Sequence, residues 1–268
     1  MEWFEAIILG LVQGLTEFLP VSSSGHLEIG KVLLGVEATD DLMFTTMVHA
    51  ATVLSTIVVF RKQILDLFKG LFKFKYNDQT DYVFKIALSC VPIMIVGLFF
   101  KEDVEALFGS IKVVGFALLL TSALLFFSDL ASKRDKVTNP ASESRNGISY
   151  LQAFVVGLGQ ALAVIPGLSR SGTTISTGLI CGVRRDVMAQ FSFLMVLIPI
   201  LGESFLELVG GEFSASSVGA LPLVLGFLSA FVSGLFACKV MIALVKKAKL
   251  SWFAIYCLIA AAAIFIFA

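Results

Sequence analysis

The sequence predicts an all-α protein that crosses a membrane several times. Of its 268 residues, 57% are hydrophobic and only 15% are charged, and the mean hydropathy is +0.93. A water-soluble domain needs more charge on its surface than this. Apolar stretches as long as a bilayer is thick recur along the chain, and two further apolar regions are interrupted by Pro, Gly and Ser. These observations predict long spanning helices together with two broken helices.

The long apolar stretches are predicted to be spans. A helix that crosses the hydrocarbon core needs about 20 mostly apolar residues, because the core is about 30 Å thick. Six segments meet this requirement: 42–60, 83–100, 111–128, 186–206, 218–238 and 250–268. The N-terminal region is not expected to be a signal peptide, since Glu2 and Glu5 stand where a signal peptide carries positive charge.

The two interrupted regions, 2–35 and 149–183, are predicted to be re-entrant helix pairs. After the first break, the apolar stretch 23–35 has only 13 residues. That is about 20 Å of helix, which is too short to cross. Each region is therefore expected to hold two short helices that enter and leave on the same side. Irregular backbone at that depth is tolerated only where protein or a water-filled cavity surrounds it.

The two broken regions resemble each other at one constant offset. Polar and glycine positions correspond: Gln13 with Gln160, Ser22 with Ser169, Ser24 with Ser171, and Gly25 with Gly172. Three predicted spans follow each region, so the second copy is inverted relative to the first. We therefore predict an inverted repeat, 1–135 and 148–268, within one membrane domain. Such repeats are typical of transporters.

Loop charge predicts the orientation in the membrane. Lys and Arg gather in the connections 61–81, 129–148 and 239–249, whereas 207–217 contains neither. The positive-inside rule places the first group in the cytoplasm, so both termini are expected outside. The formal net charge of zero gives no sign of a nucleic-acid partner. The four cysteines lie in apolar stretches without ligand spacing and are expected to be core residues.

The first break carries groups that are suited to chemistry on an anion. These groups are Gln13, Glu17, Ser22, Ser23, Ser24 and His26. Gln13 and Glu17 are four residues apart and share a helix face. The serines stand where the next half-helix begins, and the unpaired N–H groups and positive dipole end there favour an anion.

The second break carries hydroxyls and a cation. Its residues are Ser169, Arg170, Ser171, Gly172, Thr173 and Thr174. An arginine near the bilayer midplane costs at least about 2.5–3.5 kcal/mol, so an anionic partner from the protein or a ligand is expected. Its planar guanidinium suits phosphate. Because Glu17 corresponds to Val164 and Arg170 to Ser23, each copy supplies what the other lacks, and one composite site is predicted. The alternatives are a purely structural Glu17–Arg170 pair and, for His49 in the first span, a structural or supporting role.

At these residues the sequence resembles the bacterial undecaprenyl-diphosphate phosphatases that also confer bacitracin resistance. The first family signature is similar to residues 13–23, which read Gln, three residues, Glu, then Phe-Leu-Pro-Val-Ser-Ser. The second, Pro-Gly-x-Ser-Arg-Ser-Gly-x-Thr, is similar to 166–174, and the likeness extends into the last span at 253–256. Two positions depart from the family pattern. Gln13 stands where many members have Glu, which weakens a metal site, and Cys257 stands where Arg is expected.

The resemblance implies an enzyme of the bacterial cell membrane. It would hydrolyse undecaprenyl diphosphate to undecaprenyl phosphate and inorganic phosphate, which recycles the lipid carrier of cell-wall synthesis. The phosphate end of the site would open to the outer side. A transporter of the lipid carrier or of an anion is the alternative, because the inverted repeat supports it equally, while the acid, histidine and serine set favours chemistry. A homodimer is compatible with the sequence.

The resemblance also implies roles for the site residues. Arg170 would stabilise charge on the phosphoryl oxygens, and Glu17, with weak help from Gln13, would hold Mg²⁺ or Ca²⁺. Phosphate binding is expected from Ser22, Ser24, Ser169, Ser171, Gly172, Thr173 and Thr174. Ser23 is the preferred nucleophile, with His26 as its base and later as an acid. Direct attack by His26 or by a metal-bound water stays open.

Overall fold

The regular structure of the protein is helical. A computed structural model describes residues 1–36, 41–107, 110–134, 144–202, 218–247 and 249–267. The elements are α1 (Trp3–Thr16), α2 (Ser23–Leu34), α3 (Asp41–Leu71), α4 (Asp78–Phe99), α5 (Lys101–Glu105), α6 (Ile111–Arg134), the 3₁₀ turn η3 (Arg145–Gly147), α7 (Tyr150–Leu162), α8 (Arg170–Ile180), α9 (Arg185–Met195), α11 (Ala220–Lys247) and α12 (Ser251–Phe267). The all-α prediction is confirmed.

Five helices of the described residues are long and apolar enough to cross a membrane. They are Met43–Leu71, Asp78–Phe99, Ile111–Ala131, Arg185–Gly202 and Ala220–Val245, and they correspond to five of the six predicted spans. The sixth prediction, 250–268, falls on α12, which has 17 residues and is about 25 Å long. It stays a prediction. The predicted loop 207–217, the end of the span 186–206 and much of the connection 129–148 lie outside the described residues.

One predicted connection is wrong in its extent. We expected a loop over 61–81, but α3 continues to Leu71 and α4 already begins at Asp78. The lysines of this stretch end the apolar window without ending the helix, because lysine is a good helix former. The helix ends at Leu71, and the turn that follows contains Phe74, which has a left-handed backbone with φ 49°. Asn77 then caps α4 by accepting a hydrogen bond from the Thr80 N–H at 2.8 Å.

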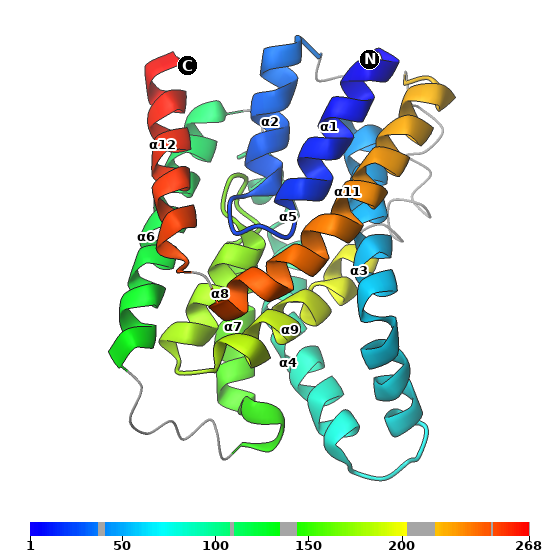
Figure 1. The fold of residues 1–268 in the computed structure, drawn as a ribbon, viewed down its shortest axis with the longest axis vertical. Helices are drawn as coiled ribbons and strands as arrows, with labels where there is room; N and C mark the ends of the chain where they lie inside the picture. Colours follow the sequence, from blue (N-terminus) through cyan, green and yellow to red (C-terminus); the bar gives the residue numbers. More distant parts are fainter. Residues whose placement is uncertain (37–40, 108–109, 135–143, 203–217, 248, 268) are drawn as a thin grey trace.

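The two broken regions form helix hairpins. In Figure 1, α1 and α2 occupy the upper half of the molecule and α7 and α8 the lower half, and their turns approach each other near mid-height. Serine caps begin both second helices: the Ser22 hydroxyl accepts from the Gly25 N–H at 3.2 Å, and the Ser169 hydroxyl accepts from the Gly172 N–H at 3.1 Å. The matched caps explain why two short helices restart at corresponding places in the sequence.

The turns of the two hairpins touch. Ser171 donates a hydrogen bond to the Leu19 carbonyl at 3.0 Å, and the Gly167 N–H donates to the Ser24 hydroxyl at 3.4 Å. The polar segments of the chain therefore satisfy each other inside the bundle, as irregular backbone within a bilayer requires.

Each hairpin also crosses a long helix at a glycine. A Cβ on Gly10 of α1 would lie 2.4 Å from the Gly226 carbonyl oxygen of α11, and one on Gly157 of α7 would lie 2.3 Å from the Ser89 carbonyl oxygen of α4. Gly10 and Gly157 correspond in the predicted repeat, so these matched crossings are the kind that two copies would make. The division into 1–135 and 148–268 remains a prediction.

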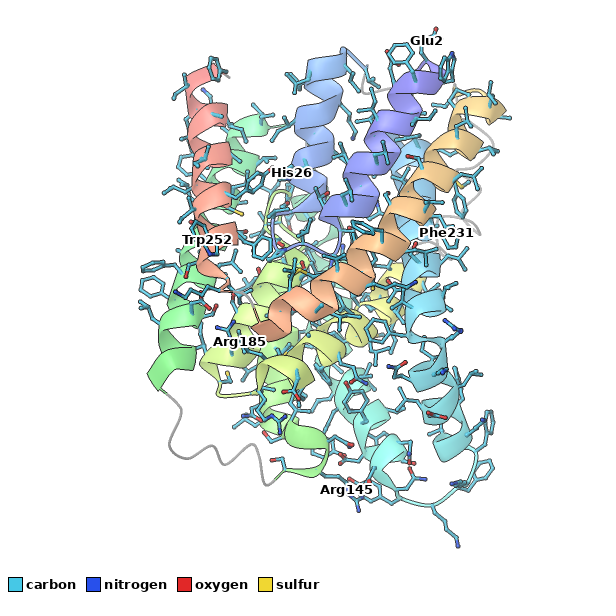
Figure 2. The ribbon with its side chains drawn as sticks, in the orientation of Figure 1. Glu2, His26, Arg145, Arg185, Phe231 and Trp252 are labelled. Carbon is cyan, nitrogen blue, oxygen red and sulfur yellow. The ribbon has the colours of Figure 1, made fainter. Side chains whose placement is uncertain are left out.

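A buried ion pair ties α4 to the start of the second half. Lys85 donates to Asp81 at 2.5 Å, and both side chains are almost fully buried. Asp81 also accepts from Tyr76 at 2.6 Å and from Tyr150 at 3.0 Å. Buried charges are tolerated when their hydrogen bonds are satisfied in this way. The network lies toward the end marked by Arg145 in Figure 2, opposite Glu2.

Candidate active site

The site begins with the carboxylate at the end of α1. Glu17 Oε2 accepts hydrogen bonds from Ser23 Oγ at 2.5 Å and from Gln13 Nε2 at 2.9 Å. The Glu17 side chain is only 11% exposed. Ser22 makes the contact possible, because its left-handed backbone (φ 72°) turns the chain so that Ser23 faces back toward α1. A non-glycine residue in that conformation is strained, and such strain concentrates at functional sites.

The contact places the Ser23 hydroxyl beside a carboxylate that can act as its base. A serine hydroxyl is a poor nucleophile at neutral pH unless a neighbouring group takes its proton. Ser23 stands at the first residue of α2, where unpaired N–H groups favour the negative charge that develops on an oxygen. Glu17 and Ser23 together therefore have the geometry of a base and its nucleophile.

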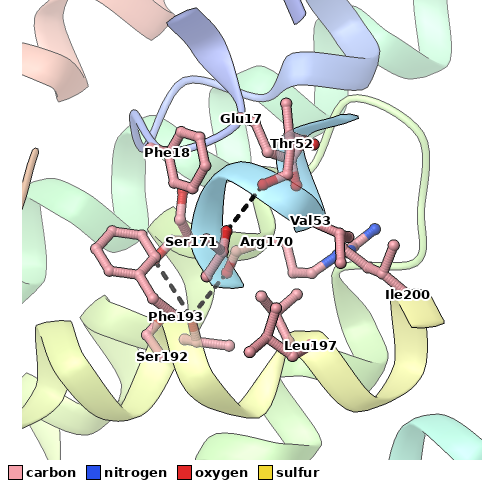
Figure 3. Close-up of a pocket in the computed structure, with 13 residues that line it drawn as sticks. Glu17, Phe18, Thr52, Val53, Arg170, Ser171, Ser192, Phe193, Leu197 and Ile200 are labelled. Carbon is pink, nitrogen blue, oxygen red and sulfur yellow. Dashed lines mark hydrogen bonds between the residues drawn. The ribbon is translucent and has the colours of Figure 1, made fainter. Parts of the chain in front are cut away.

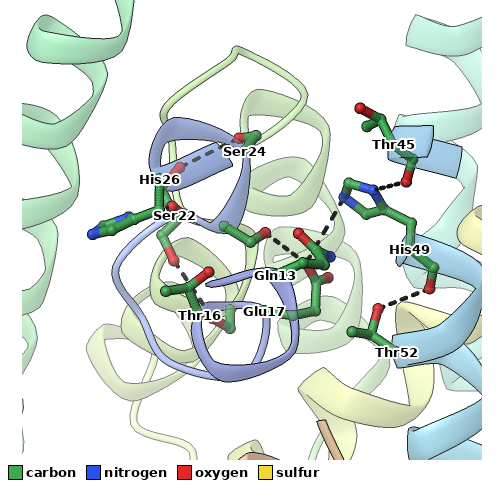
Figure 4. A network of polar contacts seen from close by, with 12 residues as sticks. Gln13, Thr16, Glu17, Ser22, Ser24, His26, Thr45, His49 and Thr52 are labelled. Atoms are coloured by element: carbon green, nitrogen blue, oxygen red, sulfur yellow. Dashed lines mark hydrogen bonds and ion pairs between the residues drawn. The ribbon is translucent and has the colours of Figure 1, made fainter. Parts of the chain in front are cut away.

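His26 does not make the contact with Ser23 that we predicted. Its Nδ1 lies 2.7 Å from the Ser22 carbonyl oxygen and its Nε2 lies 2.6 Å from the Tyr256 hydroxyl. A carbonyl can only accept, so Nδ1 carries the proton and, in the neutral ring, Nε2 accepts from Tyr256. The two rings also stack, with centroids 5.5 Å apart. Figure 4 shows the His26 ring directed away from Glu17, because it folds back over the first turn of its own helix.

A second histidine lies on the Glu17 side instead. His49 Nε2 is 3.9 Å from Glu17 Oε2, and His49 Nδ1 lies 2.8 Å from the Thr45 carbonyl oxygen. Figure 4 shows His49 of α3 turned toward Gln13 and Glu17. We expected only a structural or supporting role for this residue. Nothing in the local sequence indicates the contact, because it depends on how α3 packs beside the first hairpin.

Arg170 reaches the site from the other hairpin. It begins α8 and, with Glu17, lines a pocket that α3 and α9 close. Figure 3 shows its side chain extending across the pocket toward Val53 and Ile200. Within the described part of the chain the guanidinium makes no hydrogen bond or ion pair, although its charge acts on the Glu17 carboxylate. The arginine is therefore placed to bind an anion, and the alternative that Glu17 and Arg170 form a structural pair stays a prediction.

The pocket has a polar and an apolar side. Hydroxyls come from Thr52, Thr56, Ser171, Thr174 and Ser192, and apolar walls come from Phe18, Val53, Phe193, Val196, Leu197 and Ile200. An amphipathic lining of this kind suits a ligand that carries a polar group on an apolar chain.

The hydroxyls that we predicted to bind phosphate have varied surroundings. Ser22 and Ser169 are helix caps, and the Gly172 N–H bonds to its own cap. Ser24 and Ser171 join the two hairpins, as described above. Thr174 lies 2.7 Å from Ser192 Oγ, and the buried Thr173 hydroxyl has no hydrogen-bond partner among the described residues. The structure therefore brings all of these residues to the meeting of the hairpins, but of them only Ser171 and Thr174 line the pocket with Arg170.

The donor set fits a divalent cation that is shared with a ligand. Gln13 Oε1 is buried and has no hydrogen-bond partner in the described residues. The hydrogen bonds to Glu17 described above use one carboxylate oxygen, Oε2, and leave the other for a cation. One carboxylate and one amide oxygen suit Mg²⁺, which keeps several waters and takes further oxygens from a phosphate. Among the described residues, no group of three or more His, Cys, Asp and Glu side chains is arranged to hold a metal ion.

The contacts of two residues in α12, Tyr256 and Cys257, could not be recognised in advance. Tyr256 lies in the stretch 253–256 that carries part of the family likeness, but a tyrosine in a last apolar helix gives no sign of its partner. Cys257, which stands where the family pattern has Arg, is fully buried with its Sγ 3.7 Å from the Pro20 carbonyl oxygen. It packs against the turn of the first hairpin.

Comparisons with known proteins identify the family of the chain. The family described as "Bacitracin resistance protein BacA" matches residues 6–263. A protein of Parabacteroides distasonis named undecaprenyl-diphosphatase is 57% identical over 97% of this chain and 96% of its own length. Proteins with the same name from Bacteroides fragilis and Halothermothrix orenii are 56% and 37% identical, over 97% and 100% of this chain and 96% and 99% of their own lengths. The chain therefore belongs to the BacA family of bacitracin resistance proteins.

Proposed function

We propose that the protein hydrolyses undecaprenyl diphosphate to undecaprenyl phosphate and inorganic phosphate. Relatives that match nearly the whole chain carry the name of this activity. The observation that supports it most is the 2.5 Å hydrogen bond from Ser23 to Glu17 at a helix start, in a site that Arg170 also enters. The site brings together a base (Glu17), a nucleophile (Ser23) and the cationic side chain of Arg170, and phosphoryl transfer uses all three. A transporter needs no base for its ligand.

The first step is attack on the terminal phosphorus. Ser23 Oγ forms the new bond to phosphorus as its proton passes to Glu17. The bond from phosphorus to the bridging oxygen breaks, and undecaprenyl phosphate leaves with the electron pair and takes the proton from Glu17. Arg170 and the N–H groups at the start of α2 stabilise the charge on the phosphoryl oxygens.

The second step regenerates the enzyme. A water molecule attacks the phosphorus of the phosphoserine while Glu17 takes a proton from it. The bond between phosphorus and Ser23 Oγ breaks, Ser23 recovers a proton from Glu17, and inorganic phosphate is released. One residue thus serves as base and acid in both halves of the reaction.

Glu17 and Gln13 would hold the divalent cation. When bound, Mg²⁺ or Ca²⁺ neutralises charge on the diphosphate. The role of Gln13 is the weaker one, because a neutral amide is a poorer ligand than a carboxylate. The His26–Tyr256 pair faces away from Glu17, so we assign it no proton transfer. We propose instead that it positions the phosphate indirectly, by holding the turn at Ser22 that precedes Ser23.

The membrane orientation follows from charge. We propose that the lysine-rich end of α3 and α4 lies in the cytoplasm and that both termini lie outside. The proposal that the phosphate end of the site opens to the outer side rests on the family resemblance. The lipid tail of the substrate lies in the bilayer, and the apolar wall of the pocket is suited to its first carbons.

A phosphate-release assay tests the function. Purified protein with a prenyl diphosphate and Mg²⁺ should release inorganic phosphate, and a chelator should stop the release. The Ser23→Ala protein is the matched control and should release almost none. If the wild-type protein moves labelled lipid across vesicles without releasing phosphate, the protein is a transporter and the proposal fails.

A further inference from the structure

The turn between α3 and α4 exposes aromatic rings in an unusual way. We call residues 72–77 the α3–α4 turn. Phe72 is 68% exposed, Phe74 is 89% exposed and Tyr76 is 60% exposed. Turns that face water favour Gly, Asn, Asp, Ser and Pro. Lys73 and Lys75, also exposed, alternate with the rings.

The α3–α4 turn is held in place rather than frayed. Asn77 donates a hydrogen bond to the Gly70 carbonyl at 2.8 Å, and Tyr76 donates to Asp81 at 2.6 Å. Phe74 nevertheless has a left-handed backbone, with φ 49°, which is an outlier for a bulky residue. An ordered turn that strains and exposes an aromatic residue indicates a contact outside the chain that compensates for both.

The length of α3 places this turn at the surface of a bilayer. The helix has 31 residues and is about 46 Å long. The hydrocarbon core is about 30 Å thick, and the bilayer with its headgroups is about 40–45 Å thick. The α3–α4 turn then falls at the headgroups, at the end of the molecule opposite the termini (Figure 1).

The charge of this end matches one kind of surface. Arg61, Lys62, Lys69, Lys73 and Lys75 are exposed, against the exposed acids Asp66 and Asp78. Basic segments beside a spanning helix attract anionic lipids, and aromatic rings prefer the level of the headgroups.

We propose that the α3–α4 turn binds anionic phospholipid headgroups. Lys73 and Lys75 contact the lipid phosphates, and Phe72 and Phe74 insert between the headgroups. The binding anchors the end of α3, the helix that carries His49 and Thr52 to the site. The proposal does not depend on the proposed function, because lipid contact at this turn is measured without any reaction.

Tryptophan fluorescence tests the proposal. Trp3 and Trp252 are replaced by Phe, and Phe74→Trp then supplies the only indole. The protein is reconstituted into phosphatidylcholine vesicles with or without phosphatidylglycerol. Residue 74 should emit at shorter wavelength with phosphatidylglycerol, and brominated phosphatidylglycerol should quench it more than brominated phosphatidylcholine does. The double variant Lys73→Gln and Lys75→Gln should lose this preference, since each lysine contributes up to about fivefold at an anionic surface.

The protein offers a matched control at its other end. Trp3 is 53% exposed and is close in sequence to Glu2 and Glu5. In the control protein Phe74 is kept and Trp252 is replaced by Phe, so that Trp3 is the only tryptophan. Its fluorescence should show no preference for the anionic lipid. The proposal is overturned if residue 74 is quenched equally by both brominated lipids. It is also overturned if a water-soluble quencher reaches residue 74 as freely in vesicles as in detergent, since the turn then faces water and suits a soluble partner instead.

Discussion

Glu17 has two carboxylate oxygens with different surroundings. Oε2 accepts from Ser23 and Gln13, and these hydrogen bonds leave the other oxygen for the cation that we propose. Glu17 and Ser23 could both be predicted as site residues from the sequence, because they belong to a local polar break in an apolar region. Their contact could not, because it depends on the left-handed backbone of Ser22 between them.

Removing the negative charge of Glu17 should abolish its function as the catalytic base. We expect Glu17→Gln to lower kcat by on the order of 10²-fold or more, the scale of a preorganised electrostatic group. Phosphate release in detergent measures it. Glu28→Gln is the matched control in the same hairpin, since Glu28 pairs with Lys31 at 2.9 Å outside the site, and it should stay near wild type. A fully active Glu17→Gln protein would exclude this carboxylate as the base.

Tyr256 should act through His26. Tyr256→Phe keeps the stacked ring but removes the 2.6 Å hydrogen bond. One neutral hydrogen bond contributes about 0.5–1.5 kcal/mol, so KM for the prenyl diphosphate should rise by up to about tenfold with kcat little changed. Steady-state kinetics separate the two constants. A large fall in kcat with unchanged KM would instead place the tyrosine in the chemical step.

At the scale of the elements, the hairpins follow from the sequence and the packing of helix faces does not. Serine caps and prolines are local signals, and they define where α2 and α8 restart. The sequence predicts too early an end for α3, because the change from apolar to basic residues ends the apolar window but not the helix. The crossing of α1 on α11 depends on residues far apart in the chain, with Gly10 against the Gly226 carbonyl.

The two glycine crossings should respond alike to a methyl group. Gly10→Ala and Gly157→Ala each place a Cβ within 2.4 Å of a carbonyl oxygen, so each should destabilise the fold by about 1–3 kcal/mol. Gly97→Ala in α4 is the control, because nothing lies within 4 Å of its Cβ position, and it should be neutral or stabilising. Thermal unfolding in detergent measures all three. Tolerance at Gly10 and Gly157 would show that these helices do not cross so closely.

At the scale of the whole molecule, composition determines the class and tertiary packing determines the site. The membrane class could be predicted from the length of the apolar stretches. The composite site is predicted from the matched polar breaks, and Glu17 and Arg170 line one pocket. The contacts of His49 with Glu17 and of Tyr256 with His26 could not be predicted, because each depends on how a distant, mainly apolar helix packs against the first hairpin. The predicted orientation in the membrane rests on several exposed lysines at one end of the molecule and not on any single residue.

Cysteine labelling tests the orientation. In a protein without its native cysteines, Glu102→Cys lies in the exposed α5 after α4, and Lys73→Cys lies in the α3–α4 turn. A membrane-impermeant thiol reagent added to intact cells should modify residue 102 and should reach residue 73 only after the membrane is opened. The reverse pattern would invert the topology.

The identity of the phosphorylated residue distinguishes Ser23 from the other candidate nucleophiles. Protein is mixed with prenyl diphosphate labelled in its terminal phosphate, stopped within milliseconds in acid or in alkali, and mapped by mass spectrometry. We expect an acid-stable phosphoserine at Ser23, formed in the wild-type protein and absent from the Ser23→Ala protein. A phosphohistidine at His26 that survives only the alkaline stop would contradict it, and so would phosphate release by the Ser23→Ala protein at the wild-type rate.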